Sequence, residues 1–227
     1  MNYFKKSSLC AMVAGASIVA LAPAAAVAAP LAGSSYTMYN GATGSFNYRD
    51  FTYLPCAGSV CDTTGAALTG GTGKLTDGIS PNLSWYQYGD LTPWVGWDRN
   101  QLQGNNPTVT FNFGKTVTIN SVTIWVDNTI GYGGVYLPAS VSVAGDSHAI
   151  APDDVDPTPR AYTFTGLNIT GASVVLQFFQ SVAEPWVMVG EVSFDGTSAA
   201  VPEPASLALL GMGLAGMGLL RRRKQAG

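Results

Sequence analysis

Charged and catalytic side chains are scarce in this chain. Charged residues make up 11% of its 227 residues, and it contains a single histidine, His148. The zinc-binding pattern HExxH and the nucleophile pattern GxSxG are absent, and nothing in the sequence places His148 with a nucleophile and a carboxylate. These absences predict that the protein is not an enzyme.

Basic residues are especially few between the two ends of the chain. Residues 29–196 hold five Lys and Arg against thirteen Asp and Glu, so the net charge of this part is −8. Phosphate backbones and anionic lipids are attracted to basic surfaces. The composition therefore excludes nucleic acid as a partner, and it is compatible with calcium, with neutral sugars or with simple solubility.

Long apolar runs occur only at the two ends. At the N-terminus, Lys5 and Lys6 precede an apolar stretch over residues 9–21, and Ala26-Val27-Ala28 follows as an A-x-A cleavage site. This order is typical of a secretory signal peptide, so we expect residues 1–28 to form a signal helix that is removed on export.

Cysteine occurs only three times, and Cys10 leaves with the signal peptide. Cys56 and Cys61 remain, without neighbouring Cys or His residues that could complete a metal site. Because exported proteins fold in an oxidising compartment, we predict a disulfide between Cys56 and Cys61 that closes a small loop.

The C-terminal residues 201–227 combine three parts in a fixed order. They are a Pro-Glu-Pro box (Pro202, Glu203 and Pro204), an uncharged run over residues 205–220 and a basic cluster (Arg221, Arg222, Arg223 and Lys224, within a cytoplasmic tail over residues 221–227). The run would form a helix of roughly 24 Å, short against a hydrocarbon core of roughly 30 Å, and the cations would hold its end in the cytoplasm. On its own, the segment is typical of an ordinary transmembrane anchor.

The tripartite order resembles the PEP-CTERM sorting domain of Gram-negative bacteria. The resemblance implies that an exosortase-type enzyme recognises the segment and cleaves it near the Pro-Glu-Pro box. It also implies a protein that is anchored in the inner membrane until it is processed. After processing, delivery to the cell surface or to an exopolysaccharide matrix, as in a biofilm, is expected.

Between the two ends, strand patterns are dense and helical periodicity is nearly absent. β-Branched and aromatic residues alternate with polar ones, and Gly, Pro, Asn and Asp interrupt them. We therefore predict an all-β antiparallel β-sandwich over residues 29–196, joined to the tail by a linker over residues 197–204. The expected strands are residues 45–54, 107–113, 116–128, 135–144, 161–167, 172–180 and 186–195.

The apolar positions change phase within one of these strands. Val117 and Ile119 share one parity, whereas Val122, Ile124 and Val126 share the other. A one-residue slip would turn buried side chains outward, so we expect a bulge or bend at Asn120-Ser121.

Residues 55–106 lack strand periodicity but are rich in aromatic residues, which argues against disorder. Trp94 and Trp97 lie here in a loop context, together with Tyr88 and Arg99. Aromatic rings cover the apolar faces of sugars, and polar side chains orient a ligand by hydrogen bonds. We take these four residues as candidate ligand-binding residues, and packing in a sandwich core is the alternative for the rings.

A second resemblance spans roughly residues 75–196. The segments that carry it are LTDG (75–78), Trp85, VTFNFGKTVTINSVTIW (109–125), VYLPASVSV (135–143) and WVMVGEVSFDG (186–196). In this order they resemble a discoidin-type, galactose-binding-like domain. The resemblance implies a jelly-roll sandwich, a structural calcium ion and, in many relatives, carbohydrate binding through loops at one end.

The calcium site that this resemblance implies falls on Asp77 and Glu191, with backbone carbonyls near Lys74, Leu75 or Ser80. Two carboxylates and loop carbonyls suit the roughly six to eight oxygen ligands that calcium takes. The alternative is that Asp77 only stabilises its own Asp-Gly turn.

The sequence thus predicts an exported surface or matrix protein whose ectodomain is a carbohydrate-binding module. The alternative is a structural matrix or envelope protein with no small ligand.

Overall fold

Antiparallel strand pairing accounts for most of the fold. The structure is a computed structural model, and it describes residues 29–31, 34–53, 63–102, 105–129, 131–151, 159–180 and 185–198. Its strands are β1 (Ala29–Pro30), β2 (Ser35–Tyr39), β3 (Ala67–Gly71), β4 (Val95–Asp98), β5 (Thr108–Val126), β6 (Ser140–Val143), β7 (Asp146–Ala149), β8 (Arg160–Phe179) and β9 (Trp186–Ser198). Its short helices are α1 (Trp85–Tyr88), η1 (Gly89–Leu91) and η2 (Tyr132–Gly134).

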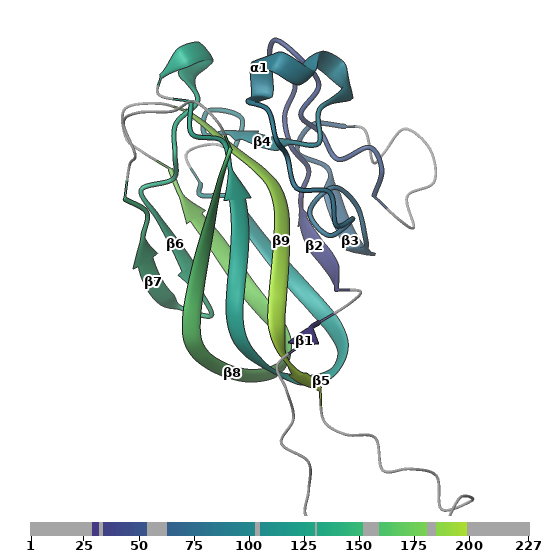
Figure 1. Ribbon diagram of the computed structural model, residues 1–227. Coiled ribbons are helices and arrows are strands. Elements are labelled where there is room, and N and C mark those ends of the chain that lie inside the picture. The colour runs from purple at the N-terminus through teal and green to yellow at the C-terminus, as the bar shows by residue number, and fades with distance from the viewer. Residues whose placement is uncertain are drawn as a thin grey trace, which may run out of the picture.

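The two longest strands pass from one layer of the sandwich to the other. Residues 108–112 of β5 pair with the C-terminal part of β8, and residues 109–112 also pair with β2. Residues 117–126 pair with β9 and with the N-terminal part of β8. One layer is therefore β3-β2-β5-β8-β6-β7, and the other holds β8, β5 and β9, with β1 and β4 also paired to β9. Figure 1 shows β5 and β8 curving together at the lower end of the molecule. All pairings between these strands are antiparallel, which confirms the predicted all-β sandwich.

The phase change in β5 is confirmed as a bulge. The register of β5 against both β8 and β9 shifts between Ile119 and Ser121. Val117 and Ile119 are buried before the shift, and Val122, Ile124 and Val126 are buried after it. The extra residue lets both sets of apolar side chains face the core.

Aromatic contacts join the two layers through the core. The ring of Phe111 in β5 lies 5.8 Å from Tyr36 of β2 and 5.0 Å from Phe194 of β9, measured between ring centroids. Trp97 of β4 stacks on Phe178 of β8 at 6.0 Å. All five rings are buried, so residues that alternate along separate strands meet in one apolar interior.

The strand predicted over residues 45–54 is wrong. In its described part, 45–53, only Asn47 forms a bridge, with Thr43. This segment is held by a side chain and not by pairing with a neighbouring strand. The fully buried Asp50 accepts hydrogen bonds from the Tyr36 hydroxyl and from the Lys74 backbone N–H, the latter at 3.2 Å. Short polar side chains that bond to the backbone stabilise loops at the expense of strands.

The other strand predictions hold with different bounds. Residues 107–113 and 116–128 merge into β5, and residues 161–167 and 172–180 merge into β8. The strand over 135–144 shortens to β6, and the strand over 186–195 extends to Ser198 as β9. The short strands β1, β2, β3, β4 and β7 were not predicted.

Several predictions fall outside the described residues. These are the signal helix over 1–28, the Cys56–Cys61 disulfide, the Pro-Glu-Pro box, the transmembrane run over 205–220 and the basic cluster. Within the described ranges, no helix has the length and apolar character needed to cross a bilayer.

The two described ends of the chain lie side by side. Ala29 of β1 pairs with Gly196 near the end of β9. Figure 1 shows this pair at the end of the sandwich opposite α1 and η2. We call the end that carries α1 and η2 the apex.

Candidate functional site

A small half-open pocket lies at the apex. Its volume is about 40 Å³, and it is lined by Gly44, Ser45, Tyr48, Trp85, Gly133, Val135, Trp186 and Met188. The Tyr48 ring lies edge-on to the Trp85 ring at 5.9 Å and to the Trp186 ring at 5.5 Å. We call this space the apical pocket. It is large enough for a water molecule or for one hydroxyl group of a ligand.

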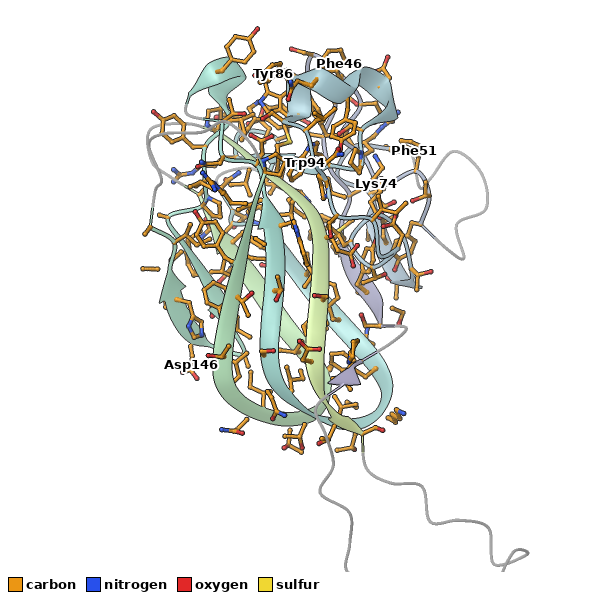
Figure 2. All side chains as sticks on the ribbon, in the orientation of Figure 1. Phe46, Phe51, Lys74, Tyr86, Trp94 and Asp146 are labelled. Atoms are coloured by element: carbon orange, nitrogen blue, oxygen red, sulfur yellow. The ribbon has the colours of Figure 1, made fainter. Side chains whose placement is uncertain are left out.

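Aromatic rings continue from the apical pocket onto the surface. Tyr132 is 63% exposed, and its ring lies 5.8 Å from Trp85 and 5.0 Å from Tyr86. Tyr86 is also exposed, and Phe46 lies 6.2 Å from Trp85 on another side. Figure 2 shows Tyr86 and Phe46 together at the apex. The pocket is thus bordered by accessible ring faces, which we call the apical rim.

Buried hydrogen bonds position the Trp85 wall of the pocket. The first N–H groups of a helix have no partner inside it, so α1 depends on caps. Asp127, which is fully buried, accepts hydrogen bonds from the Trp85 N–H and the Thr129 N–H, both at 2.7 Å. The Gln87 side chain accepts from the Ser84 N–H at 2.9 Å and completes the cap. Burial raises the pKa of Asp127, and the N–H donors oppose that shift.

Two glycines bring the other walls close to the rings. Gly133 has a φ of +66°, and a Cβ added there would lie 2.4 Å from Trp85 Cζ2. A Cβ added at Gly44 would lie 3.0 Å from Trp186 Cζ2. Because any larger side chain would meet a ring, these two positions set the width of the pocket.

Two residues that line the apical pocket, Trp85 and Tyr48, carry buried and uncharged hydrogen-bond donors. Trp85 is only 4% exposed, and its indole N–H has no hydrogen-bond partner in the part of the chain that the structure describes. A buried donor left without an acceptor is unfavourable by about 1–3 kcal/mol. Burial raises the pKa of Tyr48 above its ordinary value, which keeps this hydroxyl protonated. The pocket is therefore suited to a neutral ligand with hydroxyl groups and an apolar face.

The structure places the four candidate ligand-binding residues differently from the sequence prediction. Trp94 and Trp97 are 0% and 2% exposed, so both side chains belong to the core. The hydroxyl of the half-buried Tyr88 accepts from the Asn82 N–H and donates to its Oδ1, which closes a local loop. Arg99 is half-buried, and its backbone N–H donates to the Pro185 carbonyl. None of the four lines the apical pocket.

Most residues of the apical pocket and rim are not among the predicted ligand-binding residues. Phe46 and Tyr48 were assigned to a strand that does not form, and Trp186 to the start of a core strand. Tyr132 was not considered, although it stands between glycines in Gly131-Tyr132-Gly133-Gly134. A large aromatic residue in a glycine-rich turn cannot pack within its own segment, and this signal would have identified Tyr132.

A second feature is the carboxylate pair Asp77 and Glu191, which the structure brings together. Their carboxyl groups are in hydrogen-bonding contact, and the Gly78 N–H donates to Glu191 Oε2 at 3.2 Å. Asp77 also accepts from the Ile79 N–H at 2.8 Å, so it stabilises its own turn as well. Burial, and then the Asp77 charge, raise the pKa of Glu191 from 4.5 to about 8. Burial also raises the pKa of Asp77.

The oxygen atoms around this pair are compatible with a calcium ion. The neighbouring Thr76 hydroxyl is buried and has no hydrogen-bond partner within the described residues. Ser80 is exposed, and the Leu75 carbonyl already accepts from the Val192 N–H at 2.9 Å. No third acid, histidine or cysteine joins the pair among the described residues, so carbonyls and water would complete the coordination.

Lys74, one of the residues near which the predicted carbonyl ligands lie, buries its side chain. Its ammonium group donates to the Arg49 carbonyl at 2.7 Å and lies 4.2 Å from the centre of the Phe51 ring. Burial lowers the pKa of Lys74 to about 8. Figure 2 shows Lys74 and Phe51 on the same flank of the molecule.

Comparison with known proteins gives two family matches. A model described as the DS-like domain of discoidin domain-containing receptor 1/2 matches residues 34–196. A model of the PEP-CTERM protein-sorting motif matches residues 200–224. A search of the curated proteins finds no match.

Several solved structures of carbohydrate-binding domains are similar at low identity. The family 32 carbohydrate-binding module of C. perfringens NanJ, in complex with galactose, is 15% identical with a TM-score of 0.32, and the match covers 45% of this chain and 75% of that one. A fucolectin from the serum of the striped bass Morone saxatilis is 13% identical with a TM-score of 0.38, and the match covers 55% of this chain and 40% of that one. A further family 32 module, produced by Clostridium perfringens, is 17% identical with a TM-score of 0.27, over 44% of this chain and 75% of that one.

Proposed function

Because the chain belongs to the family of the DS-like domain of discoidin domain-containing receptor 1/2, and carries a PEP-CTERM protein-sorting motif, we propose that it is an exported protein that binds saccharides through its apical pocket. The observation that carries this proposal is the half-open pocket with aromatic walls, one of whose lining residues, Trp85, has a buried indole N–H without a partner among the described residues. The apex lies at the opposite end of the sandwich from β1 and from the last described residues of β9 (Figure 1).

In this proposal the apical rim and the apical pocket contact different parts of the sugar. The exposed rings of Tyr132 and Tyr86 cover the C–H face of a sugar ring. One sugar hydroxyl enters the pocket and accepts a hydrogen bond from the Trp85 indole N–H. Since no carboxylate or ammonium group is among the described residues that line the pocket, orientation comes from shape and from neutral hydrogen bonds.

Replacing Tyr132 by alanine is expected to weaken saccharide binding about tenfold, which corresponds to about 1.4 kcal/mol. The side chain is mostly exposed, so the fold is retained while one ring face of the rim is lost. Affinity electrophoresis of the full-length protein in gels that contain galactan, dextran or alginate measures the effect.

The matched control for this experiment is Phe51→Ala. Phe51 is an exposed aromatic residue outside the apical rim, with 41% of its surface accessible. Equal weakening by both substitutions would contradict binding at the apex. If none of the three polymers retards the wild-type protein, saccharide binding is contradicted and the alternative role of a structural matrix or envelope protein is favoured.

We also propose that Asp77 and Glu191 hold a structural calcium ion together with the Thr76 hydroxyl. Two carboxylates in contact repel each other once both are ionised, and a divalent cation removes this repulsion. Bound calcium would tie the turn at Asp77-Gly78 to β9, since Glu191 belongs to β9.

The pH dependence of stability tests the calcium proposal. Without a cation, folded Glu191 retains a proton up to about pH 8 that the unfolded chain releases near pH 4.5, so stability falls as the pH rises between these values. We expect the melting temperature in EDTA to fall between pH 5 and pH 8. Calcium should raise it by several degrees at pH 8 and much less at pH 5, because protons compete for the carboxylates.

Glu191→Gln should flatten the pH dependence and abolish the calcium effect. Asp146→Asn, at an exposed carboxylate on β7, should leave both unchanged. A calcium effect that is absent from the wild type, or unaltered in Glu191→Gln, would exclude this site.

A further inference from the structure

A larger cleft lies apart from the apical pocket. Its volume is about 630 Å³, within the range of roughly 300–1,000 Å³ that is usual for ligand sites. It is lined by Tyr39, Gly65, Trp97, Gln101, Leu102, Asn105, Asn106, Pro107, Thr108 and Gln177, none of which lines the apical pocket. We call it the amide cleft.

Amide side chains dominate the polar lining of this cleft. Gln101, Asn105, Asn106 and Gln177 provide four of them, and no carboxylate, ammonium or guanidinium group is among the described lining residues. Each amide carries both donors and an acceptor, so the cleft can bond to hydroxyl groups in either direction. An ionised ligand would lose its hydration here without gaining an opposite charge, which is unfavourable.

Several of these polar groups remain available for a ligand. The Gln177 amide and the Tyr39 hydroxyl make no hydrogen bond within the described part of the chain. The Asn105 side chain donates to the Leu102 carbonyl at 3.0 Å, and its own oxygen stays available. Tyr39 is 63% exposed, so one face of its ring can cover a sugar.

Hydrogen bonds of buried and half-buried groups hold the walls of the cleft in place. The Trp97 indole N–H donates to the Tyr39 carbonyl at 2.9 Å and so positions the Tyr39 backbone. The Gln180 side chain donates to the Trp97 carbonyl at 3.1 Å, and the Phe178 N–H donates to the Pro107 carbonyl at 2.9 Å. A site whose walls are already in place loses little ordering entropy when a ligand binds.

We infer that the amide cleft is a second saccharide site, selective for neutral glycan chains. This inference rests on the proposed function only for the class of ligand. The residues that line the amide cleft are different from those that line the apical pocket. A protein with two such sites binds two chains, or two parts of one chain, at once, and it cross-links a dissolved polysaccharide.

Retention and turbidity of the full-length protein with galactan, dextran and alginate test this inference. The wild type should be retarded by at least one neutral polymer and should precipitate it, because two sites cross-link chains. Tyr39→Ala and Gln177→Ala should each lose the precipitation and weaken retention about tenfold or less. Both residues are outside the core, and Phe51→Ala is again the matched control.

The outcomes separate this inference from the proposed function. If Tyr132→Ala weakens binding and Tyr39→Ala behaves as the wild type, the amide cleft is not a glycan site and the apical proposal stands. If only Tyr39→Ala weakens binding, the apical proposal fails and the amide cleft stands alone. Retention by alginate that depends on Tyr39, or no retention that depends on Tyr39 in any gel, overturns the inference of a neutral-glycan site.

Discussion

Trp97→Ala is expected to destabilise the protein by about 3–5 kcal/mol, the usual effect of removing a large aromatic side chain from a core. Trp97 is 2% exposed, stacks on Phe178 and donates its indole N–H to the Tyr39 carbonyl. Its removal leaves a cavity between β4 and β8 and a buried carbonyl without its donor. Urea unfolding at equilibrium measures the effect as a lower midpoint with an unchanged slope.

Trp97→Phe separates packing from hydrogen bonding. It retains a ring against Phe178 and loses only the indole N–H, so the expected loss is about 1 kcal/mol, or somewhat more because part of the ring volume is also removed. Had Trp97 been a surface ligand for sugar, alanine would leave the midpoint unchanged and abolish binding alone. That result would contradict the placement of Trp97 in the core.

The second large effect concerns processing at the C-terminus. We propose that an exosortase-type enzyme cleaves the exported chain near the Pro-Glu-Pro box and releases it to the cell surface or matrix. Mass spectrometry of the mature protein should then find a C-terminus that lacks residues 220–227. Mature surface protein that retains these residues would contradict processing.

Substitution of the box gives the complementary result. Replacing Pro202, Glu203 and Pro204 by alanine should leave nearly all of the protein in the inner membrane, because the uncharged run and the basic cluster stay attached. Ser198→Ala, at an exposed position just before the box, should be processed as the wild type. Equal release of both variants would show that the processing enzyme does not recognise the Pro-Glu-Pro box.

The alternation of apolar and polar residues along a strand was sufficient to predict features that depend on which side chains of that strand are buried. The parity change between Ile119 and Val122 was sufficient to predict the bulge, because alternation along one strand reports directly which side chains face the core. The pairing of Asp77 with Glu191 was expected from the family resemblance and not from any pattern in the residues themselves. Strand β4 was missed because three of its four residues are buried, so it shows no alternation.

The apical pocket could not be predicted in the same way. Its walls come from residues 44–48, from Trp85, from residues 133–135 and from residues 186–188, which meet only after the sandwich has formed. Trp94 and Trp97 illustrate the opposite error, since an irregular segment in the sequence need not lie on the surface. Their indole N–H groups bond to backbone carbonyls, and this allows both residues to be buried in such a segment.

The course of β9 determines how the molecule would carry tension. This strand runs from Trp186, at the apical pocket, to Ser198, beside β1, and it pairs with β5 along most of this length. A glycan held at the apex and an anchor beyond Ser198 would pull along the strand, at right angles to its interstrand hydrogen bonds. Under such a shearing load the bonds must fail together and not one after another. If the chain binds a glycan at the apex and is anchored beyond Ser198, as proposed, this course of β9 would let it resist such a load.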